Sequence, residues 1–256
     1  MAAFPAVAQS EWTKIRSVRS TVWSLVSVFL ITVALGLAIS LVARNNVSDF
    51  TENGDRPFDA TAISFIGVNF GRLAIVVFGV LAVGNEYSSG MIRVSLAAVP
   101  QRGTLLAAKT AVLGALALAA SLVTVFVTFF IGQAALGGGL STSLGSEHVL
   151  RAVFGTALYL TLLCLLSAGV TVMVRHQILA LAILVPFIML ISPILSIVPV
   201  VKDWIKYFPD QTGSAITQVV PTDDLPYGPW AGLLICAAWT AAALLGGYLV
   251  LKKRDA

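Results

Sequence analysis

The chain has 256 residues, of which 58% are hydrophobic and only 11% are charged, whereas a soluble domain carries about 25% charged residues. This balance excludes an ordinary soluble domain, and the apolar residues gather in blocks that a soluble core would not need. The net charge of +4 is distributed over the connections between these blocks, so it gives no reason to expect nucleic-acid binding.

Six apolar blocks are long enough to cross a bilayer, because a spanning helix needs about 20 mostly apolar residues. A β-barrel would instead show strands of about ten residues with alternating polarity. We therefore predict an all-α integral membrane protein with one domain over residues 1–256. The six predicted spans are 22–43, 62–83, 110–134, 150–174, 177–200 and 229–251.

The connections predict the orientation. One side would hold ten basic and three acidic residues, and the other side five basic and nine acidic residues. Because an excess of Lys and Arg marks the cytoplasmic face, both termini should lie in the cytoplasm. The segments assigned to that side are the N-terminus, 84–109, 175–176 and 252–256.

Residues 5–20 precede the first span and predict an amphipathic helix in the inner interface. Its apolar stripe leaves Lys14 and Arg16 outside, although Glu11 and Arg19 also point into the apolar arc. The alternative is an ordinary basic flank of the first span. The stripe consists of Ala8, Trp12, Ile15, Val18 and Val22.

The second span contains the one charged residue of the predicted transmembrane core, Arg72, with Asn69 one turn before it. A charge at this depth is costly and marks a functional site by default. We expect Arg72 to line a hydrated pathway at a subunit interface. In the alternative interpretation the helix sits deeper and Arg72 snorkels outward.

The stretch after the second span reads GNEYSSGMIRVSLAAVPQRG. Apolar residues recur at helical spacing up to Pro100, which predicts a short amphipathic helix over 86–98 at the cytoplasmic face. The alternative is a connector without a partner. The recurring residues are Tyr87, Met91, Val94 and Ala98.

One face of the third span carries the hydroxyl side chains of Ser121, Thr124 and Thr128. Small and hydroxyl residues allow helices to approach closely and to form hydrogen bonds. Helix packing is therefore one role for this face, and lining of the pathway is the other.

The fifth span is interrupted by Pro186, Pro193 and Pro199. Each proline removes a backbone hydrogen-bond donor, and non-helical backbone at membrane depth needs shielding by protein or a cavity. Residues 192–228 are therefore either a bent or re-entrant outer segment or part of a kinked helix.

Several kinds of chemistry find no support in the sequence. It has no phosphate-binding GxxxxGK[ST] loop, no HExxH and no GxSxG, and we expect no catalytic residue, bound cofactor, metal site or disulfide. No Asp or Glu lies within an apolar block, which argues against the carboxylate relay of an ion-coupled carrier. A transporter of this kind would need an external source of energy.

Two segments resemble a known family, the bacterial ABC type-2 permeases. The opening EWTKIRSVRS looks like the start of such permeases, and EYSSGMIRVSLAAVPQR resembles their loop after the second span. That loop commonly reads E-Y-x-x-G-T-I-R and ends in P-x-R. Met91 departs from the frequent Thr, and Ser88 from a frequent basic residue. The matching residues are Glu86, Tyr87, Gly90, Ile92, Arg93, Pro100 and Arg102.

The resemblance implies a permease subunit in a bacterial cytoplasmic membrane, paired with a second, identical or homologous permease. Two copies of a separate ATP-binding cassette subunit would bind ATP and Mg and drive export of a drug, antibiotic, peptide or lipid-like cargo. Two rivals stay open: a structural or assembly protein that anchors a partner, and an ion-coupled carrier or channel. The resemblance assigns coupling to Glu86, Tyr87, Gly90, Met91 and Arg93, and the interface helix to Trp12, Lys14, Ile15 and Arg16.

Overall fold

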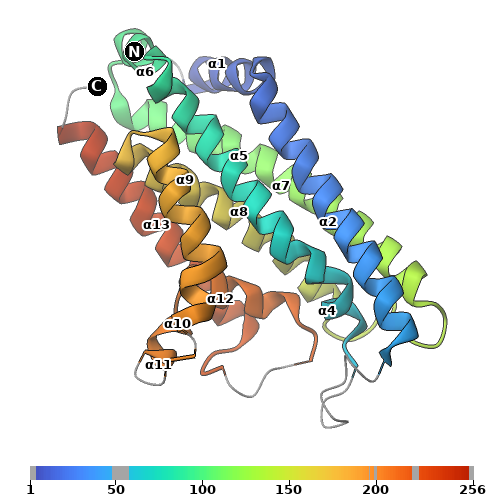
Figure 1. Ribbon diagram of the computed structural model, residues 1–256. Coiled ribbons are helices and arrows are strands. Elements are labelled where there is room, and N and C mark those ends of the chain that lie inside the picture. The colour runs from blue at the N-terminus through green and yellow to red at the C-terminus, as the bar shows by residue number, and fades with distance from the viewer. Residues whose placement is uncertain (1–3, 48–57, 196, 199–200, 221–224, 254–256) are drawn as a thin grey trace.

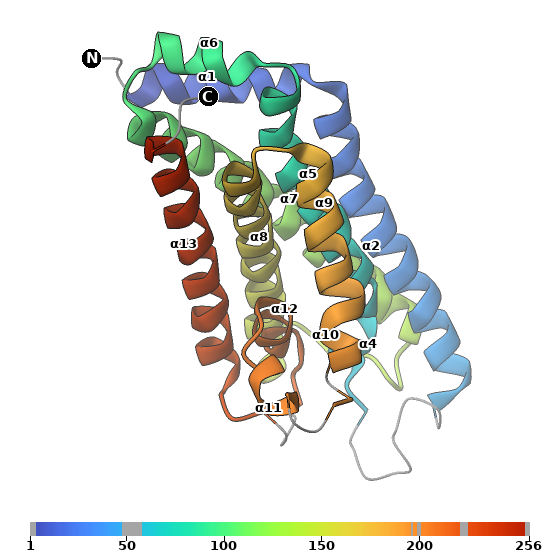
Figure 2. The same ribbon diagram turned by 60° about the vertical axis from the view of Figure 1, so that its left-hand side comes forward.

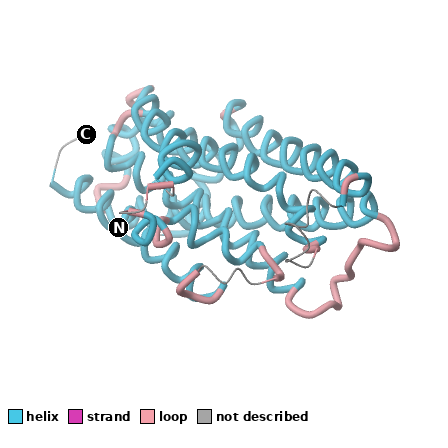
Figure 3. The backbone as a smooth tube through the Cα atoms, turned by 60° about the horizontal axis from the view of Figure 1, so that its bottom comes forward, coloured by secondary structure: helices cyan, strands magenta, loops and turns pink. Residues whose placement is uncertain are grey.

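The computed structural model describes residues 4–47, 58–195, 197–198, 201–220 and 225–253, and every regular element within them is a helix (Figure 3). Five helices in this part of the chain are long and apolar enough to cross a membrane. They run side by side along the molecule (Figure 1), and five predicted spans fall within them. The five helices are α2 (Arg19–Asn45), the composite helix Ala60–Ser88, α7 (Arg102–Leu136), α8 (Val149–Val174) and α13 (Pro229–Lys253). The composite helix consists of α4 (Ala60–Ser64), η2 (Phe65–Gly67) and α5 (Val68–Ser88).

The sixth predicted span, 177–200, corresponds to a shorter and interrupted apolar helix. It begins as α9 (Gln177–Pro186), continues as the π-helical turn η3 (Phe187–Ile191) and ends as α10 (Ser192–Leu195). The π turn follows Pro186 directly, as expected where a proline removes a donor from the helical ladder. Residues 196 and 199–200 of this prediction lie outside the described residues, and the count of six spans stays a prediction.

Helix α8 occupies the centre of the bundle and packs against α5, α7 and α13. Two glycines allow this close packing. A Cβ atom on Gly169 would lie 2.8 Å from the backbone carbon of Ala243 in α13, and one on Gly79 would lie 2.5 Å from the carbonyl oxygen of Cys164. Close backbone approach through small residues is the usual device for packing helices in a membrane.

Two short helices cross the ends of the long ones. Helices α1 (Phe4–Ser17) and α6 (Met91–Ala98) lie beside each other at one end of the bundle (Figure 2). Val18, with an extended backbone, separates α1 from α2. The start of α1 and the end of α13 lie at this same end (Figure 1), so the described parts of the basic segments assigned to the cytoplasmic side are gathered together.

At the opposite end, α11 (Lys202–Ile205), α12 (Pro209–Ser214) and η4 (Ala215–Thr217) fold back onto the bundle. The Tyr159 hydroxyl donates to the Asp210 carbonyl at 3.1 Å, and Gly213 packs against the Tyr159 ring. Tyr159 is ten residues into α8, or about 15 Å along the helix. This depth favours the re-entrant interpretation of residues 192–228, of which 221–224 lie outside the described residues.

Asp59 attaches this outer segment to the start of the second long helix. Its Oδ1 caps α4 by accepting from the backbone N–H groups of Thr61 and Ala62 at 3.0 and 2.8 Å. Its Oδ2 accepts from those of Val219 and Val220 at 2.8 and 3.0 Å. One carboxylate therefore joins two segments that are 160 residues apart.

Candidate functional site: the charge ring and the coupling surface

The short amphipathic helix predicted over residues 86–98 begins later than the sequence predicts. Residues Glu86–Ser88 complete α5, and α6 starts at Met91. Gly90 lies between them with φ of +71°, and a Cβ atom there would meet nothing within 4 Å. The positive φ breaks the helix, so the predicted range 86–98 combines the end of one helix with the whole of another.

This break also changes the face that α6 presents. The predicted apolar stripe of Met91, Val94 and Ala98 should face the bundle, yet all three residues are exposed, Val94 at 69%. Ile92 and Ser95 are buried instead. The prediction is wrong because it carries one helical register across Gly90. Helix α6 consequently presents Arg93 and Val94 on its outer surface.

A ring of four charged side chains lies beneath α6. We call Glu11, Lys14, Glu86 and Lys109 the charge ring. Lys109 contacts Glu11 and lies 2.7 Å from Glu86, while Lys14 lies 2.6 Å from Glu11 and 3.2 Å from Glu86. Each lysine therefore pairs with both glutamates, and the ring is electrically neutral.

The ring joins three helices, and a hydrogen bond attaches a fourth, α6. Glu11 and Lys14 come from α1, Glu86 from the end of α5 and Lys109 from the start of α7. Lys14 Nζ also donates to Ser95 Oγ of α6 at 2.9 Å. Glu11, Glu86 and Lys109 are 1%, 4% and 5% exposed, so their charges are compensated inside the protein.

This burial argues against a direct contact between Glu86 and a partner, although the family resemblance assigns the residue to coupling. Its carboxylate instead faces the two lysines, one of which, Lys109, lies 23 residues further along the chain. The same arrangement explains why Glu11 points into the apolar arc of α1. Val7 and Ile15 flank it on the buried face, whereas Trp12 and Arg16 are exposed.

The ring also shifts the titration of its members on α1. Burial opposes ionisation of Glu11, but Lys109 and Lys14 outweigh it and hold the pKa of Glu11 below its usual value. Burial likewise lowers the pKa of Lys14, but Glu11 and Glu86 outweigh this effect and raise it. Glu11 and Lys14 therefore both carry their charges at neutral pH.

Arg72 has an acidic neighbour that the sequence does not indicate. Its Nε donates to the Asn69 carbonyl at 3.1 Å, and its charge is close enough to act on Tyr159 of α8 and on Asp210 of α12. Asp210 is only 1% exposed. Asp210 lies outside every predicted span, so the apolar blocks themselves still supply no acidic residue for Arg72. Pathway lining and snorkelling both stay predictions for Arg72.

The hydroxyl face of the third span serves packing in this structure. Ser121, Thr124 and Thr128 are at most 1% exposed, and both threonines donate to carbonyls of their own helix at 2.7 Å. Thr128 lies against Gly36 of α2. Of the two roles considered for these residues, the described contacts favour packing over pathway lining.

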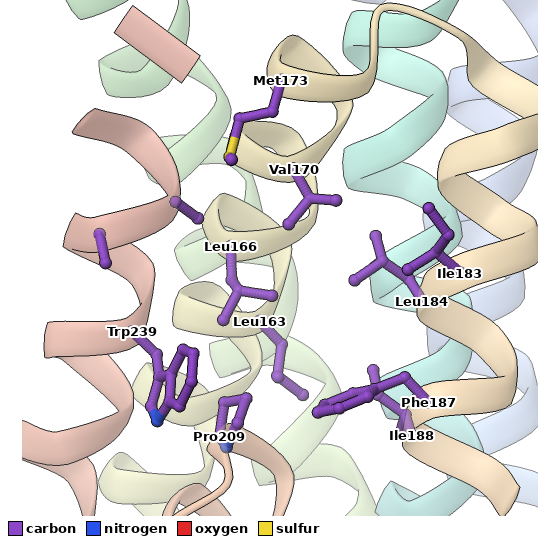
Figure 4. A pocket seen from close by; sticks show the side chains of 12 residues that line it. Leu163, Leu166, Val170, Met173, Ile183, Leu184, Phe187, Ile188, Pro209 and Trp239 are labelled. Atoms are coloured by element: carbon purple, nitrogen blue, oxygen red, sulfur yellow. The ribbon is translucent and has the colours of Figure 1, made fainter. Parts of the chain in front are cut away.

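An apolar groove of about 340 Å³ opens between α9 and α13, with α8 behind it (Figure 4). Pro209 and Trp239 border one end and Met173 the other. The Trp239 indole N–H donates to the Tyr207 carbonyl at 2.9 Å, which links α13 to the outer segment. The remaining lining residues are Leu163, Leu166, Val170, Ile183, Leu184, Phe187, Ile188, Ala242 and Ala243.

The long apolar helices define a multi-pass membrane protein. A family model described as "ABC-2 family transporter protein" matches residues 7–208, which include the charge ring, α6 and Arg72. The chain therefore belongs to the ABC-2 family of transporter membrane proteins, whose members are transport subunits and are not themselves catalytic. A comparison with curated proteins gives no match.

Proposed function

We propose that this chain is the permease subunit of an ATP-driven exporter in a bacterial cytoplasmic membrane. A second permease, identical or homologous, would complete the pathway, and two ATP-binding subunits would bind and hydrolyse ATP with Mg. Permeases of the ABC-2 family normally pair with an ATP-binding subunit. The observation that carries the proposal is the outer surface of α6, where Arg93 and Val94 are exposed beside α1.

This surface suits a groove on a partner. A short helix that presents an apolar side chain beside a cation can insert into an apolar cleft with an acidic rim. Val94 would supply the apolar contact and Arg93 the charge. Neither side chain is needed for the fold, because both point away from the bundle.

The test is to co-express the chain with the ATP-binding subunit encoded beside it and to reconstitute the complex in lipid vesicles. The complex should move cargo only with ATP and Mg. Val94→Asp and Arg93→Glu should each weaken co-purification of the partner about tenfold, as expected for the loss of an interface anchor. Lys252→Glu, at the same end and also exposed, is the matched control.

Two outcomes would favour the rivals. Transport driven by an ion gradient without the ATP-binding subunit would indicate a carrier. A stable complex that moves no cargo under any condition would indicate an anchoring protein. Glu86→Ala is less informative here than Arg93→Glu, because Glu86 is buried within the charge ring and its removal disturbs the fold.

The cargo is proposed to be amphiphilic. Arg72 favours a cargo with an anionic or strongly polar group, since its charge lies within a predicted span. The groove of Figure 4 favours an apolar portion. Arg72→Leu should reduce transport more than it reduces folding, and Val170→Trp should block the groove. If water-soluble reagents fail to label the Arg72→Cys variant in every nucleotide state, Arg72 does not line the pathway.

A further inference from the structure

Helix α6 is attached to the bundle by few buried side chains. Only Ile92 and Ser95 of α6 are buried, and Ser95 accepts a hydrogen bond from Lys14 of α1. Leu96 of α6 packs against an apolar cluster to which α1 contributes Val7 and α7 contributes Leu105. Ser95 is therefore the residue through which α6 reaches the charge ring.

Holding these helices together with the charge ring costs free energy, because charged side chains lose their hydration when they are buried. Replacing a buried ion pair by apolar side chains of similar volume is often neutral or even stabilising. Stability alone therefore does not explain why three buried charges and the partly buried Lys14 meet at this junction. Of the four pairings in the ring, three join different helices, and only the pair Glu11–Lys14 lies within one helix.

The ring also has room for a second arrangement. Glu86 Oε2 is buried and accepts no hydrogen bond from any residue that the structure describes, while Oε1 accepts from both lysines. Lys14 Nζ is the more weakly held of the two, at 3.2 Å from Oε1. A small displacement of α1 would bring Lys14 to the vacant Oε2 while its charge stays compensated.

We propose that the charge ring transmits a displacement of α6 through α1 to α5 and α7. Movement of α6 pulls Lys14 through Ser95, Lys14 changes its acceptor on Glu86, and Lys109 passes the change to the start of α7. Networks with two discrete arrangements carry coupling between distant sites in this way. The ring residues are positioning residues that touch neither nucleotide nor cargo. This inference rests on the proposed function.

The experiment compares two fourfold variants of the full chain, each in complex with the ATP-binding subunit. The neutral ring is Glu11→Gln, Lys14→Met, Glu86→Gln and Lys109→Met, which keeps side-chain volumes and removes all charges. The inverted ring is Glu11→Lys, Lys14→Glu, Glu86→Lys and Lys109→Glu, which restores every pair with opposite sign and leaves the net charge unchanged. The readouts are partner co-purification, ATP hydrolysis and the amount of cargo moved per ATP.

The neutral ring should bind the partner and hydrolyse ATP, but it should move about tenfold less cargo per ATP, a typical size for coupling between sites. The inverted ring should recover most of this loss. If the neutral ring moves as much cargo per ATP as the wild type, the ring only holds the fold and the inference is wrong.

A second variant keeps the inference testable if the fourfold variants do not fold. Ser95→Ala removes the hydrogen bond between α6 and the ring, together with a local bond from the Ser95 hydroxyl to the Met91 carbonyl. It should lower cargo moved per ATP severalfold without lowering partner binding. Unchanged coupling in Ser95→Ala would also overturn the inference. The two levels of failure are distinguishable, because a wild-type complex without ATP-driven transport refutes the proposed function, whereas normal coupling in the variants refutes only the role of the ring.

Discussion

The two ends of the bundle compensate their acidic side chains in different ways. At the end with α1 and α6, which the charge distribution predicts to be cytoplasmic and which we call the inner end, Glu11 and Glu86 are paired with lysine side chains. At the opposite end, which we call the outer end, Asp59 accepts four hydrogen bonds from backbone N–H groups. Side-chain pairs can exchange partners, whereas backbone groups of a helix start and an adjoining segment stay where the chain places them. This difference points to an adjustable inner end and a fixed outer end.

The largest effect is expected from opening the charge ring. Lys109→Met leaves Glu11 and Glu86 buried with only Lys14, and removal of one partner from a buried pair costs about 3–5 kcal/mol. The free energy of unfolding in detergent, measured by denaturant titration, should fall by this amount. Lys253→Met, at an exposed site on α13, should have little effect. An equal loss in both variants would show that the ring does not stabilise this end.

Substitutions at the outer end should lower the free energy of unfolding by a smaller amount. Asp59→Ala removes the cap of α4 and the acceptor for Val219 and Val220, which together are worth about 2–3 kcal/mol. Asp59→Asn keeps one acceptor oxygen, so its free energy of unfolding should fall by about half as much as that of Asp59→Ala in the same titration. Asp203→Ala is the control, since its carboxylate is exposed and pairs only with Lys206 on the surface. If Asp59→Ala behaves like this control, the outer segment is held by packing alone.

Between the two ends, glycine contacts set the helix spacing. Gly169→Ala should destabilise by about 1–3 kcal/mol because its Cβ would press on the backbone of α13. Gly114→Ala provides the matched comparison, since its Cβ would meet only Leu165 at 3.5 Å, an ordinary contact. That variant should be neutral or slightly stabilising, by up to about 1 kcal/mol. The melting temperatures of both variants should be measured in one detergent. If Gly114→Ala melted at a lower temperature than Gly169→Ala, the packing argument would be contradicted.

Features that depend on hydrophobicity and on local signals were predicted well from the sequence. Apolar blocks of spanning length located five long helices, and Pro186 indicated the interruption of the next one. The charge distribution grouped the segments that the structure gathers at one end. These features depend on neighbouring residues, and the bilayer imposes one length on all spans.

The failures all concern partners far apart in the chain or a break in the helix. Glu86 and Lys14 are separated by 72 residues, and no periodicity reveals such a pair. The register of α6 was wrong because Gly90 adopts a positive φ that interrupts a continuous wheel. One signal was available, since Glu11 within an apolar arc indicates a buried cation nearby.

The smallest effect, and the one specific to the inner end, is the dependence of stability on acid. The folded pKa of Glu11 is lowered from its usual value of 4.5, so its contribution to stability is fully present above that value and is lost as the pH falls through the folded pKa. The melting temperature of the wild type should therefore decline below pH 4.5 more steeply than that of the neutral ring, which lacks this carboxylate. Glu147→Gln, at an exposed outer site, should follow the wild type. Parallel acid profiles for wild type and neutral ring would mean that the lysines do not hold Glu11 in its charged form, and an adjustable inner end would lose its electrostatic basis.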